Sequence, residues 1–418
     1  MRVLVAGGGY VGLSTATGFA RQGHGIEVIE IDPIRAEMLR EGRLPFQEPS
    51  LAGAFHHEVE RGSITIHTGY HTLHGKADFA FICTSTPPTA DGSLDTSQVF
   101  QAAEMLIEAC DAPLRLIIRS TVNPGTAQQL EEKIGLGQGI QVLANPEFLR
   151  EGSGLNDFES PSRIVIGGSD AEAVDALARL YTFAVGVPLL RSNAKTAELI
   201  KLTSNAALAV RVSMANEIAH LAEADNADVD LLLEGVGWDP RIGQDYLKPG
   251  IGFGGSCLPK DLAAFRAAAQ QTGFSTPVFD GASLTNDTVV GRLASRAIEI
   301  ASHIPQPRVC VVGVGFKPGS DSLRSSQAVR LVRTLLLRGV SVTLYDQLAE
   351  SNARHEFGDR VSYAETFEAG LADADVTVLL DRSLVKPAAT ASEGVIIDAL
   401  GRQVSLAKSE GAKVYGRR

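Results

Sequence analysis

Short, mostly uninterrupted apolar runs alternate with stretches of helical periodicity over the first 190 residues. These runs occupy residues 3–6, 27–30, 79–83, 114–118 and 141–144. Runs of this kind are typical of parallel strands that are buried on both faces. Because helical stretches separate them, the pattern predicts an α/β fold in which helices cover both faces of a parallel sheet.

The middle of the chain, residues 191–300, has a helical pattern instead. Residues 195–223 contain no Pro and no Gly, and many are Ala, Leu, Val or Met. A helix over this range is longer than a typical globular helix, so we expect it to cross between domains or to pack against a partner subunit. Pro305 and Pro307 then mark a linker.

The last stretch repeats the opening pattern of strand, glycine turn, helix and strand. A strand at 309–312 precedes a glycine turn at 313–316, a helix at about 326–338 and a strand at 342–345 that ends at Asp346. This copy inserts residues 317–326 and lacks the third glycine. We interpret it as a second nucleotide-binding-like fold with an altered use, although convergence on a common fold remains open.

Composition and charge narrow the class of protein. The 418 residues are 44% hydrophobic and 21% charged, which excludes a disordered chain. The formal net charge of −11 argues against nucleic-acid and anionic-membrane partners, and leaves an anionic small substrate open. The four cysteines form no CxxC pair, no apolar run approaches the ~18 residues that span a bilayer, and no signal peptide precedes the first strand. These features predict a cytoplasmic protein.

The first glycine turn has the pattern Gly7-x-Gly9-x-x-Gly12 between a strand and a helix. Its glycines allow a tight turn, an approach of a pyrophosphate to the backbone, and close packing of helix on strand. Glu30 ends the next strand, where a carboxylate accepts hydrogen bonds from ribose hydroxyls and repels a 2′-phosphate. The pattern predicts NAD rather than NADP, a preference that Arg35 tempers. The alternative is a structural turn without a ligand.

A second glycine-rich stretch, residues 252–261, contains Cys257. If Pro259 lies in the first turn of a helix, Cys257 lies at its N-terminus beside Lys260, where a thiolate is stabilised. Asp261 is four residues further on and shares the helix face. From the local sequence alone, a buried inert cysteine is the commoner case, and it is our interpretation of the other three cysteines.

Two further pairs of residues are candidates for chemistry. Lys201 and Asn205 share a face of the long helix, so together they can stabilise an oxyanion. Thr121 and Glu147 follow strands at the sheet edge where ligands bind, and can hold a water molecule. A solvated surface pair and helix capping are the respective alternatives. Five histidines between residues 56 and 74 lack accompanying ligands, so no metal site is predicted.

Together these motifs resemble the nucleotide-sugar 6-dehydrogenases, the family of UDP-glucose and GDP-mannose dehydrogenases. The resemblance spans nearly the whole chain. It rests on residues 7–12, Ser85-Thr86-Pro87, Arg119-Ser120-Thr121, residues 145–151, Lys201 with Asn205, residues 252–261, and Gly315-Phe316-Lys317 with Arg324.

The resemblance implies two Rossmann-like doubly wound domains, joined by a long central helix and a helical dimerisation region. Their predicted bounds are 1–190 for the NAD-binding domain, 191–304 for the central region and 305–418 for the nucleotide-sugar-binding domain. It also implies oxidation of the C6 alcohol of a sugar to a carboxylate in two NAD-dependent steps, by a homodimer, without release of the aldehyde.

The resemblance also implies roles for individual residues. Catalytic roles fall on Cys257 as nucleophile, Lys201 and Asn205 at the oxyanion, Asp261 and Thr121 at a water, and Glu147 as general acid/base. Contacts to NAD fall on Gly7, Gly9, Tyr10, Val11, Gly12, Glu30, Arg35, Thr86, Thr121, Glu151, Lys260 and Arg324. Contacts to the substrate fall on Glu147, Phe148, Leu149, Lys201, Asn205, Tyr246, Phe253, Gly254, Phe316 and Lys317.

The identity of the sugar is less constrained. Residues 228–243 look more like UDP-glucose dehydrogenases, whereas Leu258 after the cysteine occurs in the GDP-mannose branch, so we favour UDP-glucose. The alternatives are the same chemistry on GDP-mannose or another nucleotide hexose, a two-electron hydroxyacid-type dehydrogenase, and a catalytically silent nucleotide-sugar sensor. Cys257 with Lys201 and Asn205 argues against the two-electron enzyme, because hydride transfer alone needs no nucleophile.

Overall fold

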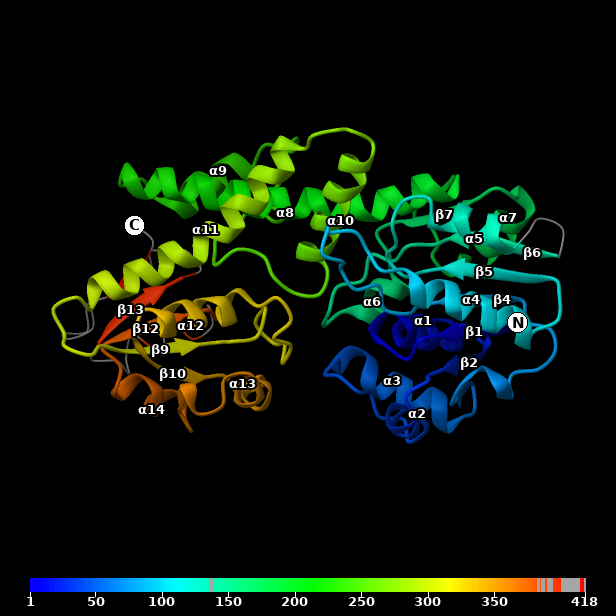
Figure 1. The fold of residues 1–418 in the computed structure, drawn as a ribbon, viewed down its shortest axis with the longest axis horizontal. Coiled ribbons are helices and arrows are strands. Elements are labelled where there is room, and N and C mark those ends of the chain that lie inside the picture. The colour runs from blue at the N-terminus through cyan, green and yellow to red at the C-terminus, as the bar shows by residue number, and fades with distance from the viewer. Residues whose placement is uncertain (135–138, 382–383, 385–387, 389–393, 400–413, 417–418) are drawn as a thin grey trace. The chain divides into compact units, whose positions relative to one another are not determined.

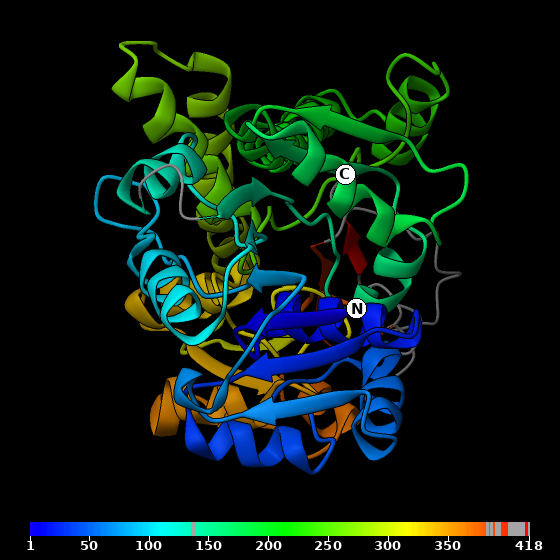
Figure 2. The ribbon, with the colours of Figure 1, turned by 90° about the vertical axis from the view of Figure 1, so that its right-hand side faces the viewer.

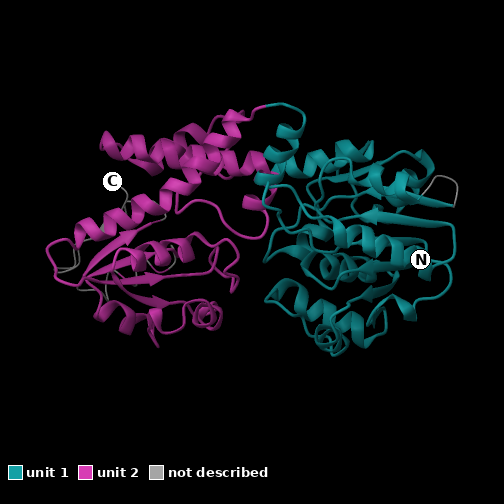
Figure 3. Cartoon of the chain, in the orientation of Figure 1, with its two compact units in different colours: residues 1–204, 263–274 teal, residues 205–262, 275–418 magenta. Residues whose placement is uncertain are grey.

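The computed structural model describes residues 1–134, 139–381, 384, 388, 394–399 and 414–416. The chain forms two compact units (Figure 3). Unit 1 contains Met1–Ser204 and Ala263–Phe274, and unit 2 contains Asn205–Leu262 and Ser275–Arg418. The division into three domains, at residues 1–190, 191–304 and 305–418, remains a prediction from the sequence.

Unit 1 is built on one extended sheet. Its strands are β1 (Arg2–Ala6), β2 (Gly25–Ile29), β3 (Ile64–His67), β4 (Phe79–Ile82), β5 (Leu114–Ile118), β6 (Ile140–Ala144), β7 (Ile164–Gly168) and β8 (Leu189–Ser192). They lie in the order β3-β2-β1-β4-β5-β6-β7-β8, and all neighbours are parallel except β6 and β7. From β1 the strand order runs one way to β2 and β3 and the other way to β4 and β5, so a switch point lies between β1 and β4. Ligands of open α/β sheets bind at such a switch point.

Helices cover both faces of this sheet (Figures 1 and 2). They are α1 (Tyr10–Arg21), α2 (Pro33–Arg40), α3 (Pro49–Glu60), α4 (Ser97–Ala109), α5 (Thr126–Ile134), α6 (Gly154–Glu159) and α7 (Ala171–Ala178), with short 3₁₀ turns at Tyr70–Thr72 and Arg179–Tyr181. Val3 and Val5 of β1 pack in one core with Leu13 of α1, whereas Leu4 of β1 packs in another with Leu106 of α4. Burial on both faces explains why these strands lack polar alternation.

The predicted long helix is confirmed as α8 (Ala194–Ala224), which starts in unit 1 and continues in unit 2. It is followed by α9 (Val229–Gly237), α10 (Leu258–Gln271) and α11 (Pro277–Ile300). In unit 2 its small side chains allow close packing: Ala215 and Ala219 form a core with Leu233 of α9. The Ser213 hydroxyl donates to the Ala282 carbonyl of α11 over 2.7 Å.

Unit 2 contains the second sheet. Its strands are β9 (Arg308–Val312), β10 (Ser341–Tyr345), β11 (Ser362–Tyr363), β12 (Val376–Leu379), β13 (Val395–Asp398) and β14 (Val414–Gly416), in the order β11-β10-β9-β12-β13-β14 with parallel pairing. The helices are α12 (Gln327–Leu337), α13 (Glu350–Phe357) and α14 (Phe367–Ala372), with a 3₁₀ turn at Gly358–Arg360. This sheet has the same switch, here between β9 and β12, so the predicted α/β class with two doubly wound sheets is confirmed.

Across the part of the chain that the structure describes, no helix combines the length and the apolar character that crossing a bilayer requires.

Candidate active site

The first glycine turn has the geometry of a phosphate-binding turn. Gly7 has a φ of +112°, and a Cβ there would lie 2.6 Å from the Cys83 carbonyl oxygen. A Cβ on Gly12 would lie only 1.9 Å from the Gly7 carbonyl oxygen, so both positions require glycine for the fold itself. A Cβ on Gly9 would meet no protein atom within 4 Å. Gly9 is also the N-cap of α1, so its open side fits a pyrophosphate at the helix N-terminus.

Glu30 directly follows β2 and is buried beside this turn. Its Oε1 accepts from the Asp32 backbone N–H over 3.0 Å, and its Oε2 lies 3.6 Å from Arg35 Nη2. The same Arg35 nitrogen donates to the Gly8 carbonyl over 3.0 Å. The structure therefore brings Glu30 and Arg35 together at the turn, where a dinucleotide ribose binds in this fold.

Tyr10, in the first turn of α1, contacts a loop that contains two other predicted residues. Its hydroxyl donates to the Arg150 carbonyl over 2.6 Å. Burial, together with the nearby carboxylates of Glu48 and Glu151, raises the pKa of Tyr10. Glu48, which sequence reasoning missed, accepts from the Gly152 N–H over 2.6 Å. Tyr10 and Glu48 thus attach the loop containing Glu151 to the NAD-binding turn.

Thr86 and Thr121 lie together at the ends of β4 and β5. The Thr86 hydroxyl donates to the Thr121 carbonyl over 2.6 Å. Just beyond Thr121, Glu198 of α8 accepts from the N–H groups of Gly125 and Ala127 over 2.5 and 2.8 Å. The sequence analysis missed Glu198, although it lies three residues before Lys201 and on the same face of the helix.

Glu147 and Lys201 form a buried ion pair. Lys201 Nζ donates to Glu147 Oε1 over 2.8 Å, and the Leu149 N–H donates to Oε2 over 2.6 Å. Burial alone would raise the pKa of Glu147, but the Lys201 ammonium, these hydrogen bonds and Arg119 outweigh it and hold that pKa below its usual value. Glu147 is therefore a carboxylate, which favours the base over the acid among its two predicted roles.

Phe148 lies under two cations. Arg163 stacks over its ring at 3.7 Å from the centroid, and Lys201 Nζ lies at 5.7 Å. Arg163 also donates to the Ser204 hydroxyl over 2.9 Å. Sequence reasoning missed Arg163, because a lone arginine before a strand has no distinguishing pattern. Phe148 and Lys201 are thus brought together, whereas the Leu149 side chain packs into the core on one face of the sheet.

Arg119 supports the turn that carries Glu147. It is buried, and its guanidinium donates to Thr15 Oγ1 over 2.8 Å and to Asn145 Oδ1 over 2.7 Å. Asn145 in turn donates to the Val165 carbonyl over 2.9 Å. The motif that the sequence shows at residues 119–121 therefore ties the ends of β5, β6 and β7 together.

In unit 2, Cys257 directly precedes α10, at the helix N-terminus that the sequence predicts. Partial positive charge at such a terminus stabilises an anion. The Asp261 N–H donates to the Cys257 carbonyl over 2.9 Å. The buried Asp261 carboxylate accepts from Asn205 Nδ2 over 2.5 Å and from Lys260 Nζ over 2.7 Å. Asn205, Lys260, Asp261 and Cys257 therefore form one cluster around the start of α10.

The remaining predicted substrate residues lie on loops of unit 2. The Gly255 N–H donates to the Arg324 carbonyl over 3.1 Å, and a Cβ on Gly255 would lie 2.7 Å from the Phe316 ring. Lys317 Nζ lies 5.6 Å from the centroid of the Phe316 ring. Phe253 is buried, whereas Tyr246 is exposed and has a φ of +58°. The stretch around Gly254 and the loop after β9 thus pack on each other.

The second glycine turn is closed by its own acidic residue. Asp346, which follows β10, accepts from the N–H groups of Val314 and Gly315 over 2.7 and 3.1 Å. These amides occupy the place that binds a pyrophosphate in a dinucleotide turn. The altered use that the sequence predicts for this copy therefore has a structural basis.

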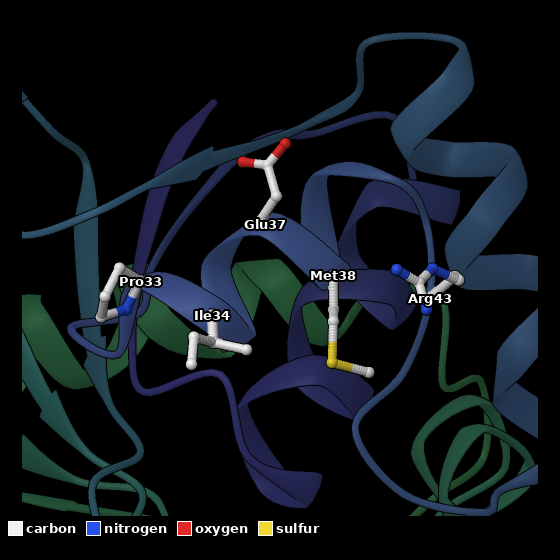
Figure 4. Close-up of a pocket in the computed structure, with 5 residues that line it drawn as sticks. All are labelled: Pro33, Ile34, Glu37, Met38 and Arg43. Atoms are coloured by element: carbon white, nitrogen blue, oxygen red, sulfur yellow. The ribbon is translucent and has the colours of Figure 1, made fainter.

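Other features lie away from these clusters. Of the three cysteines predicted to be buried, Cys83 and Cys310 are buried, and burial raises the pKa of each thiol to about 12. Cys110 is only partly buried, so the prediction is wrong there. No three His, Cys, Asp or Glu side chains among the described residues are grouped so as to hold a metal ion. A hollow of about 430 Å³ beside α2 is lined by Pro33, Ile34, Glu37, Met38 and Arg43 (Figure 4), none of which is a predicted site residue.

Family comparisons agree with this arrangement. Three models of the UDP-glucose/GDP-mannose dehydrogenase family match the chain: the NAD binding domain at residues 1–185, the central domain at 195–288 and the UDP binding domain at 310–385.

Individual relatives match along nearly the whole length. The UDP-glucose 6-dehydrogenase AglM of Haloferax volcanii is 35% identical over 396 residues, which cover 91% of this chain and 90% of the relative. A UDP-glucose dehydrogenase structure from Pyrobaculum islandicum matches with a TM-score of 0.91 at 33% identity, covering 99% of this chain and 96% of the other. A GDP-mannose dehydrogenase structure from Pseudomonas aeruginosa matches with a TM-score of 0.55 at 28% identity, covering 99% of each chain.

These matches and the glycine turn identify the protein as an NAD-dependent nucleotide-sugar dehydrogenase, and NAD is its cofactor. Gly7, Gly9, Gly12, Glu30 and Arg35 are the residues that would hold the cofactor. The chain belongs to the UDP-glucose/GDP-mannose dehydrogenase family.

Proposed function

We propose that this enzyme oxidises UDP-glucose to UDP-glucuronate by a four-electron reaction through Cys257. The observation that carries the proposal is Cys257 at the N-terminus of α10, next to the buried Asp261 and its partner Asn205. A dehydrogenase that stops at the aldehyde has no use for a nucleophile, whereas one that continues to the acid gains a covalent intermediate.

The proposed reaction has two oxidations. NAD supplies the hydride acceptor for both. In the first, the C6 alcohol loses a hydride and a proton and becomes an aldehyde. The Cys257 thiolate then adds to the aldehyde carbon to give a thiohemiacetal, whose oxidation gives a thioester. Water attacks the thioester, the C–S bond breaks, and the carboxylate leaves with regeneration of the thiolate. One alcohol, two NAD and one water thus yield one carboxylate, two NADH and three protons.

Other residues would serve charge and proton transfer in this scheme. The Lys201 ammonium and the Asn205 amide are donors suited to an oxyanion. Glu147 is ionised, which suits it to accept a proton from the attacking water. Thr121 and Asp261 are assigned to the position of that water.

The choice of UDP-glucose rests on similarity. The relatives named UDP-glucose dehydrogenases match more closely than the GDP-mannose enzyme does, and the model that matches residues 310–385 is a UDP binding domain.

The test is the number of NADH molecules formed per sugar, measured with purified protein, excess NAD and a panel of UDP- and GDP-hexoses. Two NADH per UDP-glucose are expected. Two NADH per GDP-mannose, with UDP-glucose inert, would change the sugar and keep the chemistry. One NADH per sugar would refute the thioester step. Binding of NAD and of a nucleotide sugar without turnover would favour a silent sensor.

The variant Cys257→Ser tests the proposed nucleophile directly. A serine hydroxyl is a far weaker nucleophile than a thiolate, so carboxylate formation should stop while NAD binding persists. Carboxylate made at the wild-type rate would exclude Cys257 as the nucleophile.

We further propose that unit 2 forms a homodimer through α8 and α9. Leu221 of α8, Leu231 of α9 and Trp238, which directly follows α9, are 66%, 68% and 71% exposed, and a second copy of the chain would cover them. Light scattering of the purified protein should give twice the mass of the chain. Replacing Leu231 and Trp238 by serine should give monomers, and an unchanged mass would place the interface elsewhere.

A further inference from the structure

A buried amide side chain holds the backbone four residues before Cys257. Asn286 of α11 accepts from the Phe253 N–H at Oδ1 over 2.7 Å and donates from Nδ2 to the Phe253 carbonyl over 3.1 Å. Asn286 and Phe253 are both buried. One side chain thus satisfies both polar groups of a single residue, as a neighbouring strand would, and fixes the orientation of that part of the backbone.

A second amide reaches the same residue from α12. Gln327 Nε2 donates to the Phe253 carbonyl over 3.1 Å and lies 3.4 Å from the Asn286 carbonyl. Gln327 Oε1 accepts from Arg330, so its amide orientation is set. Gln327 directly follows Ser326, the N-cap of α12, and ends the loop that contains Phe316, Lys317 and Arg324. Asn286 and Gln327 therefore share the Phe253 carbonyl as an acceptor. Through Gln327, this hydrogen bond links the loop after β9 to residues 252–255, here called the cysteine loop.

The glycines of the cysteine loop lie too close to neighbouring atoms to accept a larger side chain. A Cβ on Gly252 would lie 2.3 Å from Asn286 Oδ1, and one on Gly254 would lie 2.4 Å from the Ser325 carbonyl oxygen. Gly255 has a φ of +84°, which favours glycine. Residues 252–255 are thus fixed by close approach as well as by hydrogen bonds, immediately before the cysteine.

We propose that Asn286 and Gln327 are positioning residues that set the orientation of Cys257 and connect it to the loop after β9. Neither performs a chemical step. The proposal rests on the proposed function in giving Cys257 the nucleophilic role, but the contacts themselves do not depend on the identity of the sugar. Since a displacement of about 1 Å can reduce a rate about 10²-fold, loss of these amides should lower turnover more than cofactor affinity.

The test uses an isosteric variant, Asn286→Asp, with Thr285→Val as the control. As a carboxylate, the new side chain accepts from the Phe253 N–H but repels the Phe253 carbonyl; when protonated, it donates to that carbonyl again. Thr285 is the neighbouring buried residue on α11, and its hydroxyl donates to Glu217 instead of to a residue of the cysteine loop. Charged groups near by are Glu217 and the Arg330–Asp287 pair, which both variants retain.

The primary measurement is the rate of Cys257 alkylation by iodoacetamide, read by mass spectrometry of the peptide that contains it. This rate needs no sugar substrate. At each pH from 5.5 to 8.5, the alkylation rate of a variant is divided by that of the wild type at the same pH. Asn286→Asp should change the rate at least about fivefold at pH 8.5 and approach the wild-type rate on acidification. Gln327→Glu should also change the rate at pH 8.5, because its carboxylate has no donor for the Phe253 carbonyl. Thr285→Val should match the wild type.

Steady-state kinetics give the second measurement. Asn286→Asp should lower kcat about 10²-fold at pH 8.5 while KM for NAD changes less than about twofold. Alkylation rates of Asn286→Asp and Gln327→Glu equal to that of Thr285→Val would overturn the proposal. A wild type without turnover on any sugar would refute the proposed function instead, and the alkylation rates would still decide the positioning role.

Discussion

Replacing Lys201 by Met tests the buried ion pair with Glu147 most directly. Met has a similar length and no charge, so the change removes the ammonium and keeps most of the packing. The Lys201 and Glu147 side chains are only 5% and 6% exposed, and 2.8 Å separates Nζ from Oε1. Removing one partner of a buried pair costs about 3–5 kcal/mol, because the remaining charge is left without compensation.

The sign of the pH dependence follows from the pKa of Glu147. In the wild type this pKa lies below the ordinary value, so the stabilisation is fully present above the unfolded pKa and is lost as pH falls through the folded one. In Lys201→Met, burial prevails and raises the folded pKa above the unfolded one. The contribution of Glu147 is then present at acid pH and is lost as pH rises, so the deficit of the variant should grow from pH 5 to pH 8.

Thermal unfolding at pH 5, 6.5 and 8 measures this difference. At about 1 °C per kcal/mol for a chain of 418 residues, Lys201→Met should lower Tm by about 3–5 °C at pH 8 and by less at pH 5. Glu147→Gln combined with Lys201→Met removes both charges, and should recover most of the loss at pH 8. Turnover should fall about 10²–10³-fold in Lys201→Met, as when an oxyanion donor is removed, and should stay low in the double variant.

Two results would contradict these roles of Lys201 and Glu147. A Tm deficit that is equal at pH 5 and pH 8 would mean that Glu147 does not become an uncompensated buried charge. Normal turnover with a lowered Tm would keep the ion pair as a structural element and remove Lys201 from the proposed oxyanion site.

Three further predictions use other contacts. Gly9→Ala should leave Tm unchanged and weaken NAD binding in calorimetry, whereas Gly12→Ala should lower Tm, because only the second Cβ meets the backbone; equal Tm losses would contradict the assignment of Gly9 to the cofactor. Burial raises the pKa of Glu198 in the folded protein to about 7, from about 4.5 in the unfolded chain. The contribution of Glu198 to stability is therefore present below pH 4.5 and is lost as pH rises through about 7, a loss of about 3 kcal/mol in all. Glu198→Gln should remove this decline in a pH series of Tm values, and a persistent decline would assign it to another group. Asp346→Ala should uncap the second glycine turn and weaken binding of the nucleotide sugar at least about fivefold without changing NAD affinity, as titration of each ligand would show; a parallel loss of both affinities would indicate general unfolding.

Much of the fold was predictable because burial on both faces leaves a clear mark on a parallel strand. The apolar runs at 3–6 and 309–312 became β1 and β9, and the Pro- and Gly-free run became α8. The sequence did not reveal the antiparallel pairing of β6 with β7, because strand direction leaves no mark in an apolar run. Motif spacing likewise placed Cys257 at the start of α10, because Pro and Gly restrict where a helix begins.

The partners of the predicted residues were much less predictable. Lys201 and Asn205 share a helix face in the sequence, yet Lys201 pairs with Glu147 and Asn205 pairs with Asp261. These pairings join residues 54 and 56 positions apart, and no local rule relates them. The same holds for Asn286, whose contact with Phe253 spans 33 positions.

The two glycine turns show why a motif alone does not define a binding site. Both follow a parallel strand, and both are followed one strand later by an acidic residue, Glu30 in one case and Asp346 in the other. Asp346 accepts from the amides of its own turn, whereas Glu30 accepts from Asp32 and faces Arg35. A carboxylate that occupies the turn amides excludes an anionic phosphate from them, since like charges repel and the donors are already used. In the proposed reaction, other groups of unit 2 would therefore hold the nucleotide. We propose the loop between Gly315 and Gln327, which reaches the residues before Cys257.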